Sequence, residues 1–306
     1  MSTAAATAAP AGARKGLPRA GGQVNTLPLV GPAVALLLIF SLVPLAATLY
    51  FSVIRYNLVN PLIHGFAGIS NYRFLFADPA LLHSLFVSVA LVLEVLAITV
   101  VLGAVLASLF EARFPGRGIA RVLMISPFFV MPTVSALIWK NLLMHPVNGF
   151  IAWITRGLGL GVVDFFTDLP LPSVVIIVAW QWLPFAFLIL LTALQSLDEE
   201  TREAANIDGA GPVRTFLFIE VPHMGRAMSV VVMMETIFLL GIFAEIYVTT
   251  SGGPGIATTN LTFLIYQRAL LAFNVGGASA AGVIAIILAN ILAAFLVRAI
   301  GKRLEI

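Results

Sequence analysis

The sequence contains no cysteine and few charged residues. Without a cysteine among its 306 residues, the chain can form no disulfide, no thiol nucleophile and no thiolate metal site. Charged residues make up 10% of the sequence and hydrophobic residues 60%, and the mean hydropathy is +1.04. A water-soluble domain of this length cannot bury so much apolar surface in one core, so the composition predicts a membrane protein. The net charge of +3 is too small to indicate a nucleic-acid partner.

Motifs for nucleotide binding and hydrolysis are also missing. The sequence has no G-x-x-x-x-G-K-[ST], no HExxH and no G-x-S-x-G. The glycines of "SGGPGIATT" (251–259) come without a lysine, and a rigid turn is the better interpretation of them. We therefore expect no catalytic residue, no metal site and no cofactor in this chain. If it moves a solute at the expense of ATP, then ATP and Mg²⁺ must bind to another chain.

Long apolar runs are what the sequence has instead. A helix needs about 20 apolar residues to cross a bilayer, and six runs reach that length. The Ala-, Gly- and Pro-rich segment before them has little to bury and predicts a mobile cytoplasmic tail over residues 1–26. Residues 27–306 would then form an all-α transmembrane domain. Its six predicted transmembrane helices are Leu29–Ile54, Ser84–Phe110, Ile119–Trp139, Pro170–Leu197, Ala227–Thr250 and Ala278–Val297.

The distribution of basic residues predicts the orientation of these spans. Lysine and arginine accumulate in cytoplasmic loops of membrane proteins. If the N-terminus is cytoplasmic, most of the 17 basic residues fall on the cytoplasmic side. Both termini are then cytoplasmic. The exceptions on the outer side are Arg55, Arg73, Lys140, Arg156 and Arg268.

The predicted cytoplasmic loop between the fourth and fifth spans, residues 198–226, is half-polar. Glu199–Asp208 favours a helix, and Gly209 can adopt the left-handed conformation that ends one. Gly211 and Pro212 suit the cap and first position of a second helix, which Pro222 helps to end. The loop therefore predicts two short helices joined by an elbow. The residue types alone leave open an amphipathic loop that lies on the membrane surface.

The order of residues in this loop resembles the EAA loop of binding-protein-dependent ABC importer permeases. In that family the loop forms a coupling helix that docks into a groove of the cytoplasmic ATPase. The sequence departs from the pattern at Val221, where leucine is usual. The resemblance assigns ATPase coupling to Glu203, Ala204, Ala205, Asp208, Gly209, Ala210, Ile219 and Pro222.

Other stretches resemble the carbohydrate branch of the same family. Residues 124–154, "MISPFFVMPTVSALIWKNLLMHPVNGFIAWI", are similar to the third span and outer helix of sugar permeases. Residues 249–270 resemble the Gly-Gly-Pro turn of the maltose and glycerol-phosphate type, and residues 241–255 look most like permeases for sorbitol and mannitol. The resemblance implies a type I importer fold in the bacterial inner membrane. It also implies a second homologous permease, two ATP-binding cassette subunits, an extracytoplasmic solute-binding protein and a sugar or polyol as solute.

Polar side chains within the predicted spans are candidates for the solute path. Ionisable groups are rare in spans because each costs several kcal/mol unless it is paired or hydrated. Carboxylates and amides hydrogen-bond to sugar hydroxyls, and an indole offers an apolar face. Three carboxylates would disfavour an anionic solute but not a neutral polyol. The candidates are Glu94, Gln181, Trp182, Glu235, Glu245, Tyr247 and Asn290.

Two alternatives remain open from the residues. Buried amides and carboxylates also join helices to one another without touching any solute. A proton-coupled secondary transporter could use Glu94 and Glu235 as proton carriers, although we find no internal repeat of the kind that such transporters often contain. Pro127, Pro132 and Pro184 are expected to kink the third and fourth spans, either at a cavity wall or around neighbouring helices.

Overall fold

The computed structural model describes residues 27–60, 62, 64–112 and 114–304. The tail predicted over residues 1–26 lies outside the described residues. The chain divides into two compact units, Met1–Leu45 and Ala46–Ile306. The described part of the first unit is the start of helix α1 (Leu27–Ser52), and the second unit holds the remaining elements.

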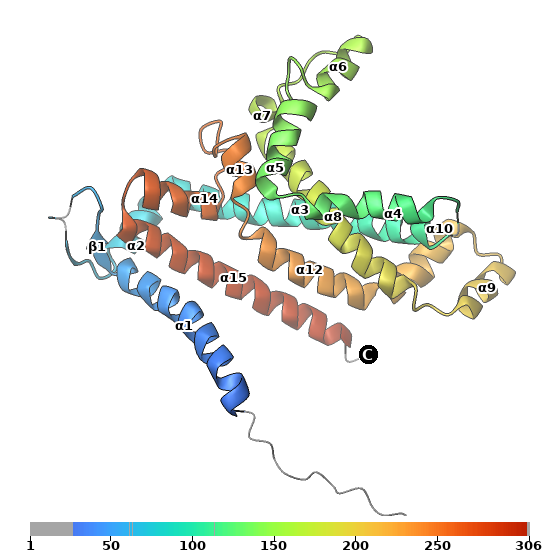
Figure 1. Ribbon diagram of the computed structural model, residues 1–306, viewed down its shortest axis with the longest axis horizontal. Helices are drawn as coiled ribbons and strands as arrows, with labels where there is room; N and C mark the ends of the chain where they lie inside the picture. The colour runs from blue at the N-terminus through green and yellow to red at the C-terminus, as the bar shows by residue number, and fades with distance from the viewer. Residues whose placement is uncertain (1–26, 61, 63, 113, 305–306) are drawn as a thin grey trace, which may run out of the picture. The chain divides into compact units, whose positions relative to one another are not determined.

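The described residues are helical over most of their length (Figure 1). A two-stranded antiparallel sheet pairs β1 (Ile54–Tyr56) with β2 (His64–Phe66), with Arg55 opposite Gly65. The helices of the second unit after this sheet are α2 (Ser70–Ala77), α3 (Pro79–Glu111), α4 (Arg117–Ile125), η1 (Ser126–Phe129), α5 (Pro132–Leu137), η2 (Ile138–Leu143), α6 (Phe150–Gly157), α7 (Phe165–Asp168), α8 (Pro170–Leu194), α9 (Glu199–Ile207), α10 (Pro212–Thr215), η3 (Phe216–Glu220), α11 (Val221–His223), α12 (Gly225–Leu239), α13 (Ala244–Thr249), α14 (Leu261–Tyr266), η4 (Gln267–Leu271) and α15 (Val275–Leu304).

Four of the predicted spans are continuous helices. Among the described residues, α1, α3, α8 and α15 are each long and apolar enough to cross a bilayer. Helix α3 begins five residues before its predicted start, because the Asp78 side chain accepts a hydrogen bond from the Ala80 N–H and Pro79 occupies the first position. Helix α8 ends at Leu194, three residues short of the prediction.

The kink predicted for the third span, Ile119–Trp139, is present as a sharp break. Helix α4 continues into η1, and the chain then bends by 101° into α5 and η2. Pro132 is the first residue of α5; its ring removes an N–H donor and disfavours helical geometry at the residue before it. Met131 accordingly has a ψ of 139°, outside the helical range.

The fifth predicted span, Ala227–Thr250, is also interrupted. Helix α12 ends at Leu239, and α13 begins at Ala244 after a non-helical connection. At its other end, α12 bends by 64° from the helical segment Pro212–His223. Two bent pairs of helical segments are long and apolar enough to cross a bilayer only together: Arg117–Phe129 with Pro132–Leu143, and Pro212–His223 with Gly225–Leu239. The described chain therefore has six spans only if each of these two pairs counts as one.

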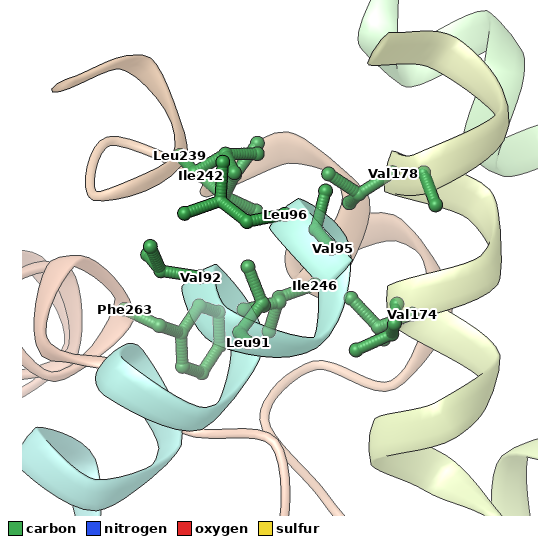
Figure 2. Close-up of a cluster of buried hydrophobic side chains, with 12 residues drawn as sticks. Leu91, Val92, Val95, Leu96, Val174, Val178, Leu239, Ile242, Ile246 and Phe263 are labelled. Carbon is green, nitrogen blue, oxygen red and sulfur yellow. The ribbon is translucent and has the colours of Figure 1, made fainter. Parts of the chain in front are cut away.

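Helices α3 and α8 form the centre of the second unit. The two backbones come close together at Gly103 and Ala186. A Cβ at position 103 would lie 3.1 Å from that of Ala186, so the absence of one permits this approach. A buried cluster on one side of this contact joins α3 and α8 to residues of α12, α13 and α14 (Figure 2). The cluster includes Leu91, Val95, Val178, Ile246 and Phe263. Small residues on α3 thus serve helix packing.

Candidate functional site

The helix–elbow–helix predicted for the polar loop is confirmed. Helix α9 covers Glu199–Ile207, and Gly209 has a φ of +79°, in the left-handed region. Gly211 is the N-cap of α10, and Pro212 is its first residue. The proline needs no N–H partner at that position, and its fixed φ suits a helix start. The elbow is therefore specified chiefly by Gly209 and Pro212.

The second helix of the elbow widens in its middle. Residues Phe216–Glu220 form a π-helical turn between α10 and α11. Pro222, two residues after this turn, has no N–H to donate to the carbonyl of Phe218, so a regular α-helix would lose a hydrogen bond there. A π-turn changes the register of the hydrogen bonds and is frequent at functional sites. The helical segment ends at His223, one residue beyond Pro222.

The predicted coupling residues lie mostly on the surface of the elbow. Glu203, Ala204, Asp208, Gly209 and Pro222 are exposed, whereas Ala210 and Ile219 are half-buried and Ala205 is buried.

The elbow also exposes large apolar side chains that the sequence did not single out. Phe218 is 76% exposed, and Ile207, Val213 and Leu217 are exposed with it. Exposed large apolar side chains on a polar loop make it a candidate for an interaction surface. Their alternation with Arg214 and Asp208 is the signal in the sequence that could have identified them.

A cavity of about 590 Å³ lies between the two broken spans. One wall is the bend between η1 and α5, the second is the connection between α12 and α13, and α8 contributes the third. The lining residues are Phe128, Phe129, Val130, Met131, Pro132, Gln181, Trp182, Phe238, Gly241, Ile242, Phe243, Ala244 and Glu245.

Side chains donate hydrogen bonds to backbone carbonyls at both helix breaks. The carbonyl groups at such breaks have lost their helical partners and need others. Gln181 Nε2 donates to the Val130 carbonyl at 2.7 Å, at the first break. Asn260 Nδ2 donates to the Ile242 carbonyl at 2.6 Å, and Thr262 Oγ1 donates to the Leu240 carbonyl at 2.9 Å, at the second. The shape of the cavity therefore depends on these hydrogen bonds.

The polar groups of the cavity are hydrogen-bond acceptors. Gln181 is only 6% exposed, and its Oε1 is buried without a partner among the described residues. Glu245 is 2% exposed, and among the described residues its carboxylate forms no ion pair. Among the described residues, the cavity lining includes no lysine, arginine or histidine. A solute that donates hydrogen bonds and carries no negative charge suits this set.

Aromatic rings form a large part of the cavity wall. The Trp182 ring lies with its centroid 5.8 Å from that of Phe128 and 5.3 Å from that of Phe238. Phe243 stacks on Tyr247 with centroids 5.5 Å apart. Of these rings, the sequence singled out Trp182 and Tyr247. The sequence did offer a signal for the other three rings, because they lie close to residues that break helices. Phe128 lies near Pro127 and Pro132, and Phe238 and Phe243 lie near Gly241.

The structure brings together three of the predicted solute-path residues, Gln181, Trp182 and Glu245. Glu235 is fully buried outside the described lining, and its Oε2 accepts a hydrogen bond from Thr99 Oγ1 at 2.6 Å. This contact joins α12 to α3, as expected for a polar group that links helices. Glu94 and Asn290 are exposed on α3 and α15 and do not line the cavity, and Asn290 bonds to Ile286 of its own helix. Tyr247 is half-exposed beside the cavity.

Comparison with known protein families gives a match over most of the chain. Residues 99–306 match the family described as "Binding-protein-dependent transport system inner membrane component". The matched region contains the elbow and all the cavity-lining residues.

Curated relatives align with most of the chain. A probable ABC transporter permease protein of Sinorhizobium fredii is 32% identical over 251 residues, which cover 81% of both chains. The trehalose/maltose transport system permease protein MalF of Thermococcus litoralis is 31% identical and covers 78% of this chain and 81% of its own length. The sn-glycerol-3-phosphate permease UgpA of Agrobacterium fabrum is 29% identical, with 90% and 94% covered.

A solved structure shares the fold. The matching chain comes from a bacterial ABC transporter that imports the acidic polysaccharide alginate. It superposes with a TM-score of 0.75 at 19% sequence identity and covers 90% of this chain and 94% of that one. A second structure of the alginate transporter, in complex with its pentasaccharide-bound periplasmic protein, gives a TM-score of 0.71.

Proposed function

The chain belongs to the family of inner membrane components of binding-protein-dependent transport systems, and we propose that its solute is an uncharged sugar or sugar alcohol that passes through the cavity between the two broken spans. It is a permease subunit of an ABC importer with a type I fold in the inner membrane. ATP is hydrolysed by partner subunits and not by this chain. Membership of this family gives no support to the proton-coupled alternative.

The observation that carries the choice of solute is the composition of the cavity wall. Aromatic rings are suited to the apolar faces of a sugar or the carbon chain of a polyol, and acceptor oxygens are suited to its hydroxyl groups. Among the described residues, the lining offers an anionic solute no lysine, arginine or histidine as a partner. The name of MalF specifies trehalose and maltose, which are uncharged, whereas that of UgpA specifies a phosphate ester. The wall favours the first kind of solute. Among uncharged solutes, the resemblance of residues 241–255 to sorbitol and mannitol permeases supports a polyol.

The proposed mechanism is alternating access. A loaded solute-binding protein docks on the outer loops, and closure of the two ATPases pulls on the elbow. The cavity, shared with a second homologous permease, then opens outward and receives the solute. Hydrolysis of ATP returns it to the inward-facing state. The ATPases contact this chain through the coupling residues. The exposed apolar side chains of the elbow support such a contact.

Stimulation of ATP hydrolysis by candidate solutes tests this proposal. The chain is reconstituted in liposomes with the second permease, the ATPase and the binding protein encoded beside it. Hydrolysis is measured with sorbitol, mannitol, maltose, trehalose and sn-glycerol 3-phosphate. We expect one of the uncharged solutes to stimulate hydrolysis and the phosphate ester to have no effect. Stimulation by the phosphate ester alone would refute an uncharged solute.

A further inference from the structure

An arginine of the elbow joins three elements near the end of α3. Arg202 lies on α9, Glu111 is the last residue of α3, and Glu220 is the last residue of η3. Arg202 Nη1 lies 3.4 Å from Glu111 Oε1, and Arg202 Nη2 lies 3.4 Å from Glu220 Oε1. We call these three residues the arginine node. None of them was among the residues predicted to couple the ATPase.

The arginine node is partly removed from solvent. The side chain of Glu220 is 9% exposed, and those of Arg202 and Glu111 are 23% and 24% exposed. Loss of one partner from such a group leaves an uncompensated charge in a partly apolar environment. The planar guanidinium presents donors in two directions at once, which the point charge of a lysine does not. Arg202 is therefore suited to hold two carboxylates from different elements.

The arginine node connects both helices of the elbow to the end of α3. Helix α9 and the segment Pro212–His223 are joined in sequence only through the turn at Gly209, whose backbone is free to bend. Arg202 connects α9 to η3 across that turn and connects both to the end of α3. In Figure 1, α9 and α10 lie at the same end of the second unit. The three elements are thus joined by side-chain ion pairs as well as by the chain.

Helix α3 leads from the arginine node to the cavity. Thr99 on α3 donates a hydrogen bond to Glu235 on α12, one of the two helices that flank the second break. Further along α3, Leu91 and Val95 pack in the cluster that contains Ile242 and Ile246 (Figure 2). Ile242 itself lines the cavity. The ion pairs, the Thr99–Glu235 hydrogen bond and this cluster form a continuous series of contacts from the elbow to the cavity wall.

We propose that Arg202 is a positioning residue that transmits movement of the elbow to α3 and so couples ATP hydrolysis to opening of the cavity. The inference rests on the proposed function, because it concerns how the partner ATPase moves this chain. The role of Arg202 differs from that of the residues on the elbow surface that would contact the ATPase, because Arg202 binds two carboxylates of this same chain. Loss of the arginine node leaves the ATPase able to bind and hydrolyse ATP while the permease responds less.

The test compares three variants in the reconstituted transporter. Arg202→Gln leaves both carboxylates unpaired. The triple variant Arg202→Gln, Glu111→Gln and Glu220→Gln removes the ion pairs without leaving a buried unpaired charge. Arg226→Gln is the matched control, because Arg226 is exposed on α12 and forms no ion pair among the described residues. Solute uptake, ATP hydrolysis, thermal stability and recovery of the assembled transporter are measured for each.

We expect the triple variant to assemble and to melt near the wild-type temperature, yet to move at least about fivefold less solute per ATP, the lower range of coupling between sites. Arg226→Gln should retain the wild-type ratio. A purely structural role predicts that the triple variant recovers both stability and the wild-type ratio, and that result would overturn the inference. A wild-type transporter whose hydrolysis ignores every solute would instead refute the proposed function, so the two failures are distinguishable.

Discussion

At the scale of single residues, the cavity wall carries the polar side chains of Gln181 and Glu245, and both are buried. A glutamate in an apolar run is conspicuous, and its place on the cavity wall agrees with its selection as a candidate. The sequence could not distinguish Glu245 from Glu94, because both are carboxylates in spans. Only the packing of α3 leaves Glu94 exposed and outside the described lining. The second role of Gln181, a donor to the carbonyl of Val130, depends on a bend that residue types do not reveal.

Replacement of Glu245 by leucine should weaken the response to solute. A hydrogen bond contributes about 0.5–1.5 kcal/mol, so the solute concentration for half-maximal stimulation of hydrolysis should rise roughly two- to tenfold. Glu245→Gln keeps an acceptor oxygen and should have a smaller effect. Glu94→Gln is the control outside the described lining and should behave like the wild type. A larger effect of Glu94→Gln than of Glu245→Leu would contradict the cavity as the solute site.

Replacement of Gly209 by valine should uncouple hydrolysis from solute. With a φ of +79°, this position disfavours side chains, and a β-branched residue most of all. The strain is on the order of 1–3 kcal/mol and should displace the elbow without disturbing the spans. Gly211→Ala is the matched control, since Gly211 has a φ of −71° and open space for a Cβ. Coupled transport by Gly209→Val at the wild-type ratio of solute to ATP would count against the elbow as the coupling element.

At the scale of elements, proline and glycine explain most of what the sequence could predict. The elbow was predictable because Gly209 permits a left-handed turn and Pro212 fixes φ at the start of the second helix. The 101° bend at Pro132 was predictable as a kink but not as a right-angle break, since proline alone leaves its size to the surrounding packing. The break after Leu239 lies beside Gly241 and is held by Asn260 and Thr262, about twenty residues later in the chain. Such long-range partners are not visible in a hydropathy pattern.

Replacement of Asn260 by leucine should destabilise the break between α12 and α13. The change leaves the carbonyl of Ile242 and the N–H of Phe263 without their side-chain partners, at a cost of about 1–3 kcal/mol for each buried group. We expect a lower midpoint of thermal unfolding in detergent and a weaker response to solute. Asn290→Leu is the control, because Asn290 is exposed and bonds to its own helix. Equal unfolding midpoints for the two variants would argue against the role of Asn260.

At the scale of the whole molecule, the chain exposes apolar surface of two kinds. Side chains such as Leu102 and Ile291 lie on helices long enough to cross a bilayer, where lipid or another permease covers them. Phe218 and Ile207 lie instead on the elbow. Membership of the family accounts for the first surface, because the permease is embedded in the membrane, and the proposed docking of the ATPase on the elbow would account for the second. Residue composition predicted the first surface and could not locate the second.

Replacement of Phe218 by aspartate should weaken assembly with the ATPase. Burial of a phenylalanine contributes about 1.5–3 kcal/mol, and a buried unpaired carboxylate adds to the loss. We expect less ATPase to be recovered with the variant permease after detergent extraction, while the second permease is recovered normally. Leu62→Asp is the control, since Leu62 is exposed in the turn between β1 and β2, away from the elbow in sequence. Full recovery of the ATPase with Phe218→Asp would refute the apolar elbow surface as its docking site.

The most direct test of the central claim is whether solute occupies the cavity during transport. Because the chain has no cysteine, Ala244→Cys places a single thiol of this chain on the cavity wall. Ala272→Cys places one on an exposed position outside the described lining. The measurement is the rate of maleimide labelling of each variant in reconstituted transporters that are hydrolysing ATP, with and without the stimulating solute, followed by uptake. The account predicts that solute slows labelling of Ala244→Cys alone and that this label abolishes uptake. Labelling that is indifferent to solute, with uptake preserved after modification, would contradict it.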